Sequence, residues 1–293
     1  MHCQLRKPIA FRRLKWLTVS MLKPDLPYFD DPEGACIPAA CSRVIDAHVH
    51  VFPPNIFSAI WKWFDIHAWK IRYRLTTKEI FQFLLDRGIC HVVALQYAHK
   101  PGIAEQLNMY LANEITKFKG RVSGMATVFP GEPDSCAILK KAFSSGLTGV
   151  KLHAHVQCFD MNAPYMDEIY QICSDEQKPL IMHVGTEPKS EAYTCDPYQL
   201  CSTKKLEPVL QHFPDLKLCV PHLGFGETRA YRKLIESYDN LWTDTTMVIC
   251  DYFPMEEPVD LSRYRMDRVM YGSDFPNIPF EWDRELNVLA KSK

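Results

Sequence analysis

Two histidines, His48 and His50, stand one residue apart near the end of an apolar run that begins at Val44. The β-branched residues of this run predict a buried strand. Because side chains alternate along a strand, both imidazoles lie on one face, and at a rise of about 3.3 Å per residue they can converge on one metal ion. Phe52-Pro53-Pro54 ends the strand, so the pair lies at its carboxyl end. A His-x-His motif alone is weak evidence for a metal site, and the rest of the chain must supply the other ligands.

Eight apolar segments, each followed by a segment with helical periodicity, divide the chain from residue 44 onward. Short apolar strands that alternate with helices indicate a parallel sheet. The length from 44 to 293 is typical of a (β/α)8 TIM barrel, which is the α/β fold that we predict. An open doubly wound sheet is the competing fold, but no Gly-x-Gly-x-x-Gly follows any strand. The predicted strands are 44–50, 91–97, 122–129, 149–153, 180–184, 217–221, 241–245 and 269–272.

Residues 1–43 differ from the barrel segment and form a predicted N-terminal extension. Basic and apolar side chains interleave before Met21, which allows a targeting segment or a translation start at Met21 instead of Met1. Several prolines between 22 and 43 predict an extended strap that leads into the barrel. The predicted domain division is therefore an extension over 1–43 and a catalytic barrel over 44–293.

Composition excludes several classes of function. The chain has 34 Lys+Arg against 35 Asp+Glu, and no basic stripe indicates a nucleic-acid partner. The 11 cysteines include no Cys-x-x-Cys pair, a pattern typical of a reducing cytoplasm, where we expect the protein to reside. No apolar stretch reaches the length of about 20 residues that a membrane span needs.

Polar residues gather at the predicted carboxyl ends of the strands, and a barrel brings these ends together on one face. Several buried imidazoles on one small ring would each need a hydrogen-bond partner, and a metal ion supplies that partner. Three imidazoles and one carboxylate suit zinc or another divalent transition metal, with a position left for water. The ligands that we predict are His48, His50, His183 and Asp274; the other polar residues at strand ends are Tyr97, His99, Lys151, His153, His222 and Asp244.

Four motifs in this order resemble those of the amidohydrolase superfamily: HVH at 48–50, IMHVG at 181–185, VPHLG at 220–224 and YGSDFP at 271–276. The likeness extends from Val44 to the carboxyl end and is greatest to the branch that includes aminocarboxymuconate-semialdehyde decarboxylase and resorcylate-type decarboxylases. The resemblance implies one zinc ion per chain, held by the four predicted ligands, with His222 as the catalytic base or water-orienting group. It also implies a homodimer, and a further helix beyond the one near Trp282. Since the sequence ends at Lys293, we expect a short last helix or a truncation there.

The chemistry of such a site follows from its parts. Zinc lowers the pKa of a bound water to about 7 and polarises a substrate carbonyl, and an imidazole such as that of His222 can exchange the proton. Asp274 is both a ligand and a proton acceptor. The leading prediction is a metal-dependent hydrolase that opens an amide, ester or lactone-like bond. The alternative is a zinc-dependent non-oxidative decarboxylase of an aromatic or unsaturated carboxylic acid, and a third possibility is an inactive barrel that only binds.

Other residues are candidates for contact with a small, carboxylate-bearing substrate. Lys151 could be carboxylated and bridge two metals, but in the resembling branch it remains an ammonium near a substrate anion. Tyr193 and Arg229 are further predicted substrate contacts, and Tyr193 lies in a long loop after His183 that supplies specificity or covers the surface. The remaining candidates are Glu187 and Lys189 in the same loop, and His153 and His155, for which support of the site and surface exposure are both open.

Overall fold

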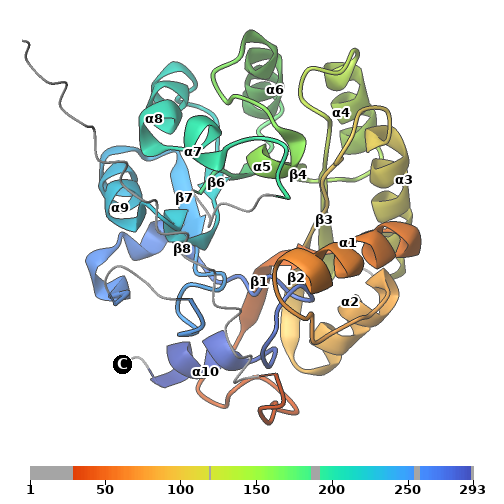
Figure 1. Ribbon diagram of the computed structural model, residues 1–293, viewed down its shortest axis with the longest axis vertical. Coiled ribbons are helices and arrows are strands. Elements are labelled where there is room, and N and C mark those ends of the chain that lie inside the picture. The colour runs from red at the N-terminus through yellow and green to blue at the C-terminus, as the bar shows by residue number, and fades with distance from the viewer. Residues whose placement is uncertain (1–28, 119, 186–191, 254–257, 292–293) are drawn as a thin grey trace, which may run out of the picture.

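Eight parallel strands, paired in chain order, form one sheet in the computed structural model, which describes residues 29–118, 120–185, 192–253 and 258–291 (Figure 1). This arrangement confirms the predicted barrel, and each predicted strand has a counterpart within a few residues. The strands are β1 (Val44–His50), β2 (Ile89–Leu95), β3 (Val122–Ala126), β4 (Gly149–His153), β5 (Leu180–His183), β6 (Leu218–Val220), β7 (Leu241–Asp244) and β8 (Val269–Met270).

The barrel closes where the chain after β8 returns to β1. The backbone N–H of Ala47 donates to the carbonyl of Tyr271 at 3.0 Å, and the N–H of Asp274 donates to the carbonyl of His48 at 2.9 Å. A parallel bridge between Val49 and Phe275 continues the contact. β8 itself is only two residues long, so much of this seam is built by irregular backbone that carries a predicted metal ligand.

Helices surround the strands in Figure 1. The longer helices pack apolar side chains inward, as α2 does with Ile80, Phe81 and Leu84 after a capping box formed by Thr76 and Glu79. The helices are α1 (Pro54–His67), α2 (Thr77–Asp86), α3 (Ala104–Ile115), α4 (Ser135–Ser144), α5 (Ala154–Gln157), α6 (Pro164–Asp175), α7 (Pro197–Leu200), α8 (Thr203–His212), α9 (Thr228–Ser237) and α10 (Arg284–Lys291), with 3₁₀ turns at Thr116–Phe118, His222–Gly224, Leu261–Arg263 and Met266–Arg268.

Two of these helices are absent from the sequence-based prediction. Residues 154–157 were expected in a loop but form the single helical turn α5, and α7 follows the loop after β5. Each has only four residues, too few to show a 3.6-residue periodicity. α5 decides the position of His155, so this correction affects the site.

The inside of the barrel is filled by apolar side chains on the inward faces of the strands. Leu95, Met125, Ile181 and Cys219 form a separate buried cluster inside the larger core that lies between sheet and helices. Because side chains alternate, the next inward positions toward the carboxyl ends of the strands are where the polar residues stand. The apolar cluster therefore lies directly beneath the polar residues inside the barrel.

The described part of the N-terminal extension packs against the barrel. Ile37 donates its N–H to the carbonyl of Arg87 at 2.8 Å, and the Trp282 indole donates to the carbonyl of Gly34 at 2.9 Å. The described part of the predicted strap, residues 29–43, thus contacts both the carboxyl end of α2 and the carboxyl-terminal segment. The predictions for residues 1–28, including the choice between Met1 and Met21, fall outside the described residues.

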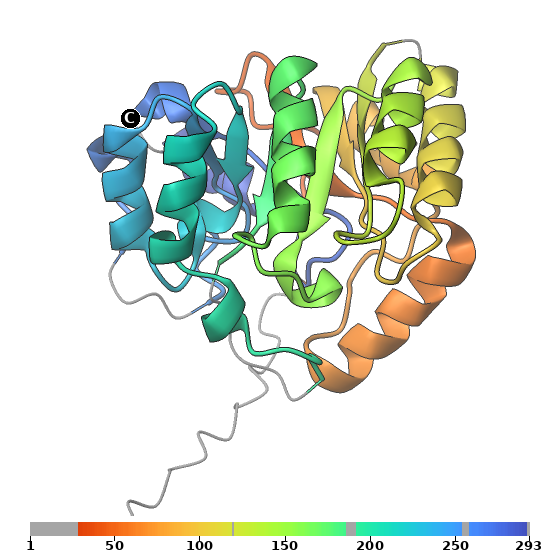
Figure 2. The same ribbon diagram turned by 90° about the horizontal axis from the view of Figure 1, so that it is seen from above.

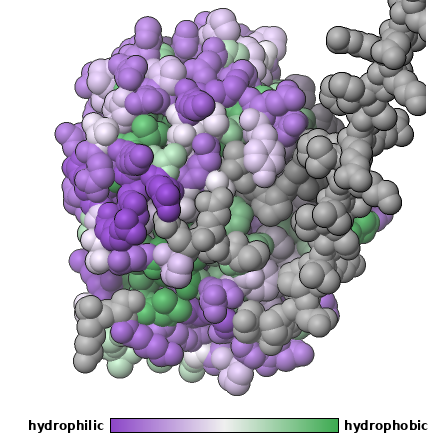
Figure 3. Space-filling model, turned by 60° about the vertical axis from the view of Figure 1, so that its left-hand side comes forward, coloured by the Kyte–Doolittle hydropathy of each residue, from purple (hydrophilic) through white to green (hydrophobic). Residues whose placement is uncertain are grey.

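The surface has the character expected for amphipathic helices around a closed barrel. On the face in Figure 3, hydrophilic side chains predominate and hydrophobic ones form smaller patches. Within the described ranges, every helix is too short or too polar to cross a bilayer.

Candidate metal centre

His48 and His50 lie side by side on the inner face of β1, as the alternation of the strand predicts. His48 is fully buried and His50 is 5% exposed. Their Nε2 atoms are 3.2 Å apart. The two rings therefore converge on one point near the centre of the barrel mouth.

Asp274 reaches the same point from the segment after β8. Its Oδ1 lies 3.0 Å from Nε2 of His50 and 3.3 Å from Nε2 of His48. The residue has a φ of 63°, in the left-handed region that a non-glycine residue adopts only when the surrounding structure holds it there. The hydrogen bond from its N–H to the carbonyl of His48 helps to stabilise this backbone conformation.

Asp244, at the end of β7, fixes the orientation and tautomer of His48. Its Oδ2 is 2.8 Å from Nδ1 of His48, while its Oδ1 accepts the backbone N–H of His222 at 2.9 Å. Burial acts to raise the pKa of Asp244, but its contacts with His48 and with the backbone N–H of His222 more than offset this and hold that pKa below its usual range. The ionised carboxylate accepts a hydrogen bond from Nδ1–H of the neutral ring, so Nε2 of His48 presents a lone pair. The sequence placed Asp244 at a strand end, but this supporting role depends on a contact between β1 and β7.

The donor set fits a divalent cation. Burial lowers the pKa of His48 to about 3 and also lowers that of His50, which keeps both rings in the neutral form that binds metal. Burial would raise the pKa of Asp274, but His50 and His48 together hold it low, so the carboxylate stays ionised. Nε2 of His48 and Oδ1 of Asp274 both act as hydrogen-bond acceptors, and both lie next to Nε2 of His50. One proton on that nitrogen cannot form a good hydrogen bond to both acceptors. His48, His50 and Asp274 form a group whose potential ligand atoms lie within 4.8 Å of one another, a metal-binding site of the kind predicted.

His222 stands beside this group, in a 3₁₀ turn directly after β6. It has a φ of 60° and is 8% exposed. Its Nδ1 lies 3.0 Å from the carbonyl oxygen of Thr246, and because a carbonyl can only accept, Nδ1 carries the proton of the neutral ring. Nε2 is then unprotonated, and it faces Nδ1 of His183 at 3.2 Å.

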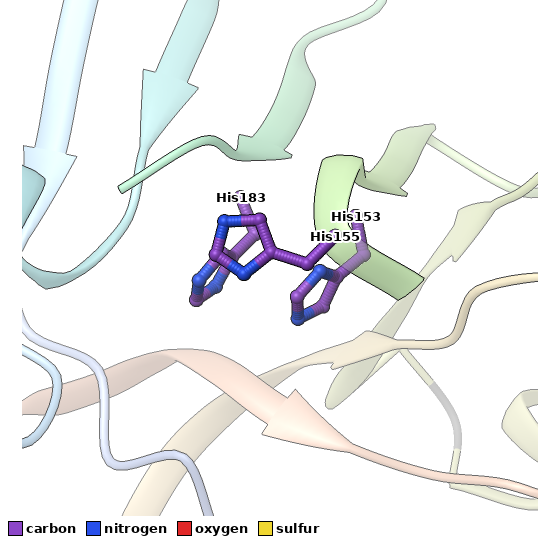
Figure 4. Close-up of side chains that lie close together, drawn as sticks. All are labelled: His153, His155 and His183. Atoms are coloured by element: carbon purple, nitrogen blue, oxygen red, sulfur yellow. The ribbon is translucent and has the colours of Figure 1, made fainter. Parts of the chain in front are cut away.

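A second group of three histidines lies next to the first and contains His183. His153 at the end of β4 and His183 at the end of β5 are register partners, and their rings stack with centroids 4.1 Å apart. Figure 4 shows that His155 extends from α5 over the same region, and the potential ligand atoms of the three rings lie within 4.8 Å of one another. Nε2 of His155 donates to the carbonyl of Gly185 at 2.8 Å, which fixes its tautomer.

The structure thus brings together three of the four predicted ligands. His183 is linked to them through His222 but groups with His153 and His155, so its membership in the metal shell stays a prediction. The sequence left His153 and His155 open between support of the site and the surface; both are buried. Their convergence depends on the register of β4 against β5 and on the short α5.

Two further predicted residues lie between the histidine groups. Lys151 is fully buried on β4, and its charge contributes to lowering the pKa of both His48 and His153. The Tyr97 ring meets His50 and His153 edge-on, with centroids 5.8 and 5.0 Å away. A basic side chain and an aromatic ring are therefore both close to residues of the two histidine groups.

The remaining predicted contacts divide. Tyr193 packs between His155 and Trp63 of α1, with ring centroids 5.6 and 5.7 Å away, so it lines the wall of the site (Figure 2 shows α1 and the chain before α7 at the same end of the barrel). Arg229 is exposed in the first turn of α9, and His99 is also exposed, so neither joins the buried group. Glu187 and Lys189 fall outside the described residues.

Several solved structures resemble this chain in fold. An uncharacterised TIM-barrel protein from Bordetella bronchiseptica aligns with a TM-score of 0.64 at 16% identity, covering 86% of this chain and 92% of its own. The 5-carboxyvanillate decarboxylase of Novosphingobium aromaticivorans, in complex with manganese and a nitrobenzoic acid, aligns with a TM-score of 0.60 at 16% identity, covering 89% and 94%. A probable 2-pyrone-4,6-dicarboxylic acid hydrolase from Acinetobacter baumannii, with citric acid bound, gives 0.54 at 16% identity, covering 85% and 90%.

At such identities these likenesses establish the fold alone. Comparison with curated protein sequences finds no match. The family model described as amidohydrolase, however, matches residues 45–292, which is nearly all of the barrel and includes both groups of histidines. A His/Asp metal-binding site at the barrel mouth agrees with this match. The chain belongs to the amidohydrolase family.

Proposed function

We propose that this protein is a metal-dependent hydrolase that opens an amide, ester or lactone-like bond in a small, carboxylate-bearing substrate. The family contains both hydrolases and carboxy-lyases, so the choice depends on the site itself. The choice of a hydrolase rests on the tautomer of His222. Its Nδ1 donates to the carbonyl of Thr246, so its Nε2 can accept a proton. A group prepared to accept a proton at the start of the reaction suits the activation of water.

The proposed metal ligands are His48, His50 and Asp274, with His183 as the predicted fourth. Zinc is the proposed ion, and manganese, which the similar decarboxylase contains, is the first alternative. When bound, such an ion supplies an acidified water and a Lewis acid for the substrate carbonyl. The contact of His222 with His183, at 3.2 Å, is at the long end of hydrogen bonds, so a water placed closer can replace it.

The substrate would lie between the two histidine groups. Lys151, which is fully buried on β4, would lie near the substrate carboxylate as a basic partner. Tyr97 and Tyr193 would pack against its apolar part. We propose that Lys151 is not carboxylated, so it does not bridge two metals and the site holds one ion. A metal content of two ions per chain would indicate a carboxylated, bridging Lys151 or an ion in the second histidine group.

The test is the variant His222→Asn, compared with wild type. Turnover should fall about 10²- to 10⁴-fold, the usual contribution of a general base, while metal content stays unchanged. Asn tolerates the left-handed backbone of this position, so the fold should persist. The matched control is His212→Asn, at an exposed position on α8. Loss of the metal in the His222 variant would make His222 a ligand and refute its role as base.

A non-oxidative decarboxylase is the second candidate. It is favoured by the buried Lys151 on β4, by the Tyr97 ring packed edge-on against His153, and by the likeness to 5-carboxyvanillate decarboxylase. The two functions are separated by assaying dihydroxybenzoates for carbon dioxide release and esters and lactones for acid release. Carbon dioxide without hydrolysis would overturn the hydrolase proposal and leave the metal ligands unaffected.

A further inference from the structure

Two cysteines outside the metal-binding group lie against one backbone oxygen. Cys158 is the residue that ends α5, with a φ of 50°, and Cys195 precedes α7. The Sγ of Cys158 is 3.3 Å from the carbonyl oxygen of His155, and the Sγ of Cys195 is 3.2 Å from the same oxygen. Both sulfurs therefore lie next to one point of the backbone. A disulfide needs a sulfur–sulfur distance of about 2.05 Å, so both side chains must turn from the shared carbonyl oxygen toward each other.

The two thiols have different surroundings. Cys158 is exposed and contacts the hydroxyl of Thr194 at 2.9 Å, whereas Cys195 is partly buried. Burial and the neighbouring Cys158 raise the pKa of Cys195 to about 12, so this residue stays a thiol. An oxidant therefore meets Cys158 first, and Cys195 is placed to react with the product.

We propose that Cys158 and Cys195 form a reversible disulfide when a hydroperoxide oxidises the protein. The thiolate of Cys158 attacks one peroxide oxygen, the O–O bond breaks, and hydroxide leaves, which gives a sulfenic acid. The sulfur of Cys195 then attacks that of Cys158, the S–O bond breaks, and water leaves with the proton of the thiol. With hydrogen peroxide, two thiols and one peroxide give one disulfide and two waters. A dithiol reverses the reaction.

The bond would fix one wall of the candidate site. It would tie α5, which carries His155, to the segment that carries Tyr193, and Tyr193 packs between His155 and Trp63. In a reducing compartment such a bond is transient and acts as a response to oxidant. The proposal goes beyond the proposed function and does not depend on it.

The experiment treats the full-length, metal-loaded protein with hydrogen peroxide and maps tryptic peptides without reduction. The peptides 152–189 and 190–204 should be joined with the loss of two hydrogens. Each also carries one other cysteine, Cys173 or Cys201, so fragmentation must assign the bond. Hydrogen exchange of residues 192–196 should slow on oxidation and recover with dithiothreitol.

The variants Cys158→Ser and Cys195→Ser should each abolish the joined peptide, whereas the control Cys36→Ser, at an exposed site elsewhere, should retain it. Circular dichroism of each variant establishes that it is folded. The proposal is overturned if the wild-type protein gives no bond between 158 and 195 while Cys158 proceeds to sulfinic acid. It is also overturned if Cys158 pairs with another cysteine instead.

Discussion

Asp244 illustrates how one carboxylate that need not touch the metal can decide whether the metal binds. It holds Nδ1 of His48 at 2.8 Å and the backbone of His222 at 2.9 Å, so it orients both a proposed ligand and the proposed base. Removing its charge leaves His48 free to adopt the other tautomer, whose Nε2 carries a proton and cannot bind a metal.

Asp244→Asn should therefore weaken metal binding about 10- to 100-fold, the usual effect of losing such a supporting group. Competition with a chromophoric chelator measures the affinity. Asp239→Asn is the control, because that carboxylate is exposed and pairs with Arg265 at the surface. Equal affinities in the two variants would mean that Asp244 does not orient His48.

Asp46, below the metal group on β1, should make stability depend on pH. Burial raises its pKa to about 7, although the hydroxyl of Ser273 donates to it at 2.6 Å and the N–H of His48 at 3.1 Å. The folded protein therefore keeps a proton that the unfolded chain releases at its ordinary pKa of 3.8. The stability present below pH 3.8 is lost as the pH rises toward 7.

In the variant Asp46→Asn, the free energy of unfolding should no longer fall as the pH rises from about 4 to 7. A shift of roughly three pKa units at about 1.4 kcal/mol each sets an upper limit of about 4 kcal/mol across the window. Urea unfolding of the metal-free protein between pH 4 and 8 measures it, with the exposed Asp215→Asn as control. A variant that keeps the wild-type slope would assign the pH dependence to other groups.

At the scale of elements, the turn after β6 shows how local backbone strain places a functional side chain. His222, Leu223 and Gly224 all have positive φ, and the turn contacts α9. A Cβ on Gly224 would lie 2.0 Å from the ring of Tyr231, which is buried and donates its hydroxyl to the carbonyl of Val184 at 3.2 Å.

Gly224→Ala should cost about 2–4 kcal/mol, from the left-handed backbone and the overpacked ring together. Tyr231 would have to move, and the turn that carries His222 would move with it, so turnover should fall as well. Thermal unfolding and turnover are the measurements. Gly146→Ala is the matched control, because its φ is +95° but nothing lies within 4 Å of the added carbon, so only the backbone cost remains. If both variants lose equal stability, the close approach to Tyr231 adds nothing to the cost of Gly224→Ala.

The sequence predicts elements well where periodicity is strong. The eight strands are apolar runs bounded by helices, and the inward placement of His48 and His50 follows from alternation alone. The grouping of His183 with His153 and His155 depends on the register of β4 against β5 and on a four-residue helix, neither of which leaves a periodic signal. The support of His48 by Asp244 crosses 196 positions and needs the closed barrel.

At the scale of the whole molecule, the metal group lies across the seam of the barrel. His48 and His50 belong to β1, whereas Asp274 follows β8, and few backbone hydrogen bonds join these two ends. An ion held by all three would connect the first strand to the last. The same ion is the element on which the proposed hydrolysis depends.

The most direct test of this account is anomalous diffraction from crystals of the protein loaded with zinc, recorded at the zinc edge. We expect a peak between Nε2 of His48, Nε2 of His50 and Oδ1 of Asp274, and loss of that peak in His50→Gln. Zinc bound elsewhere, with no peak at this position in the wild-type protein, would contradict the account.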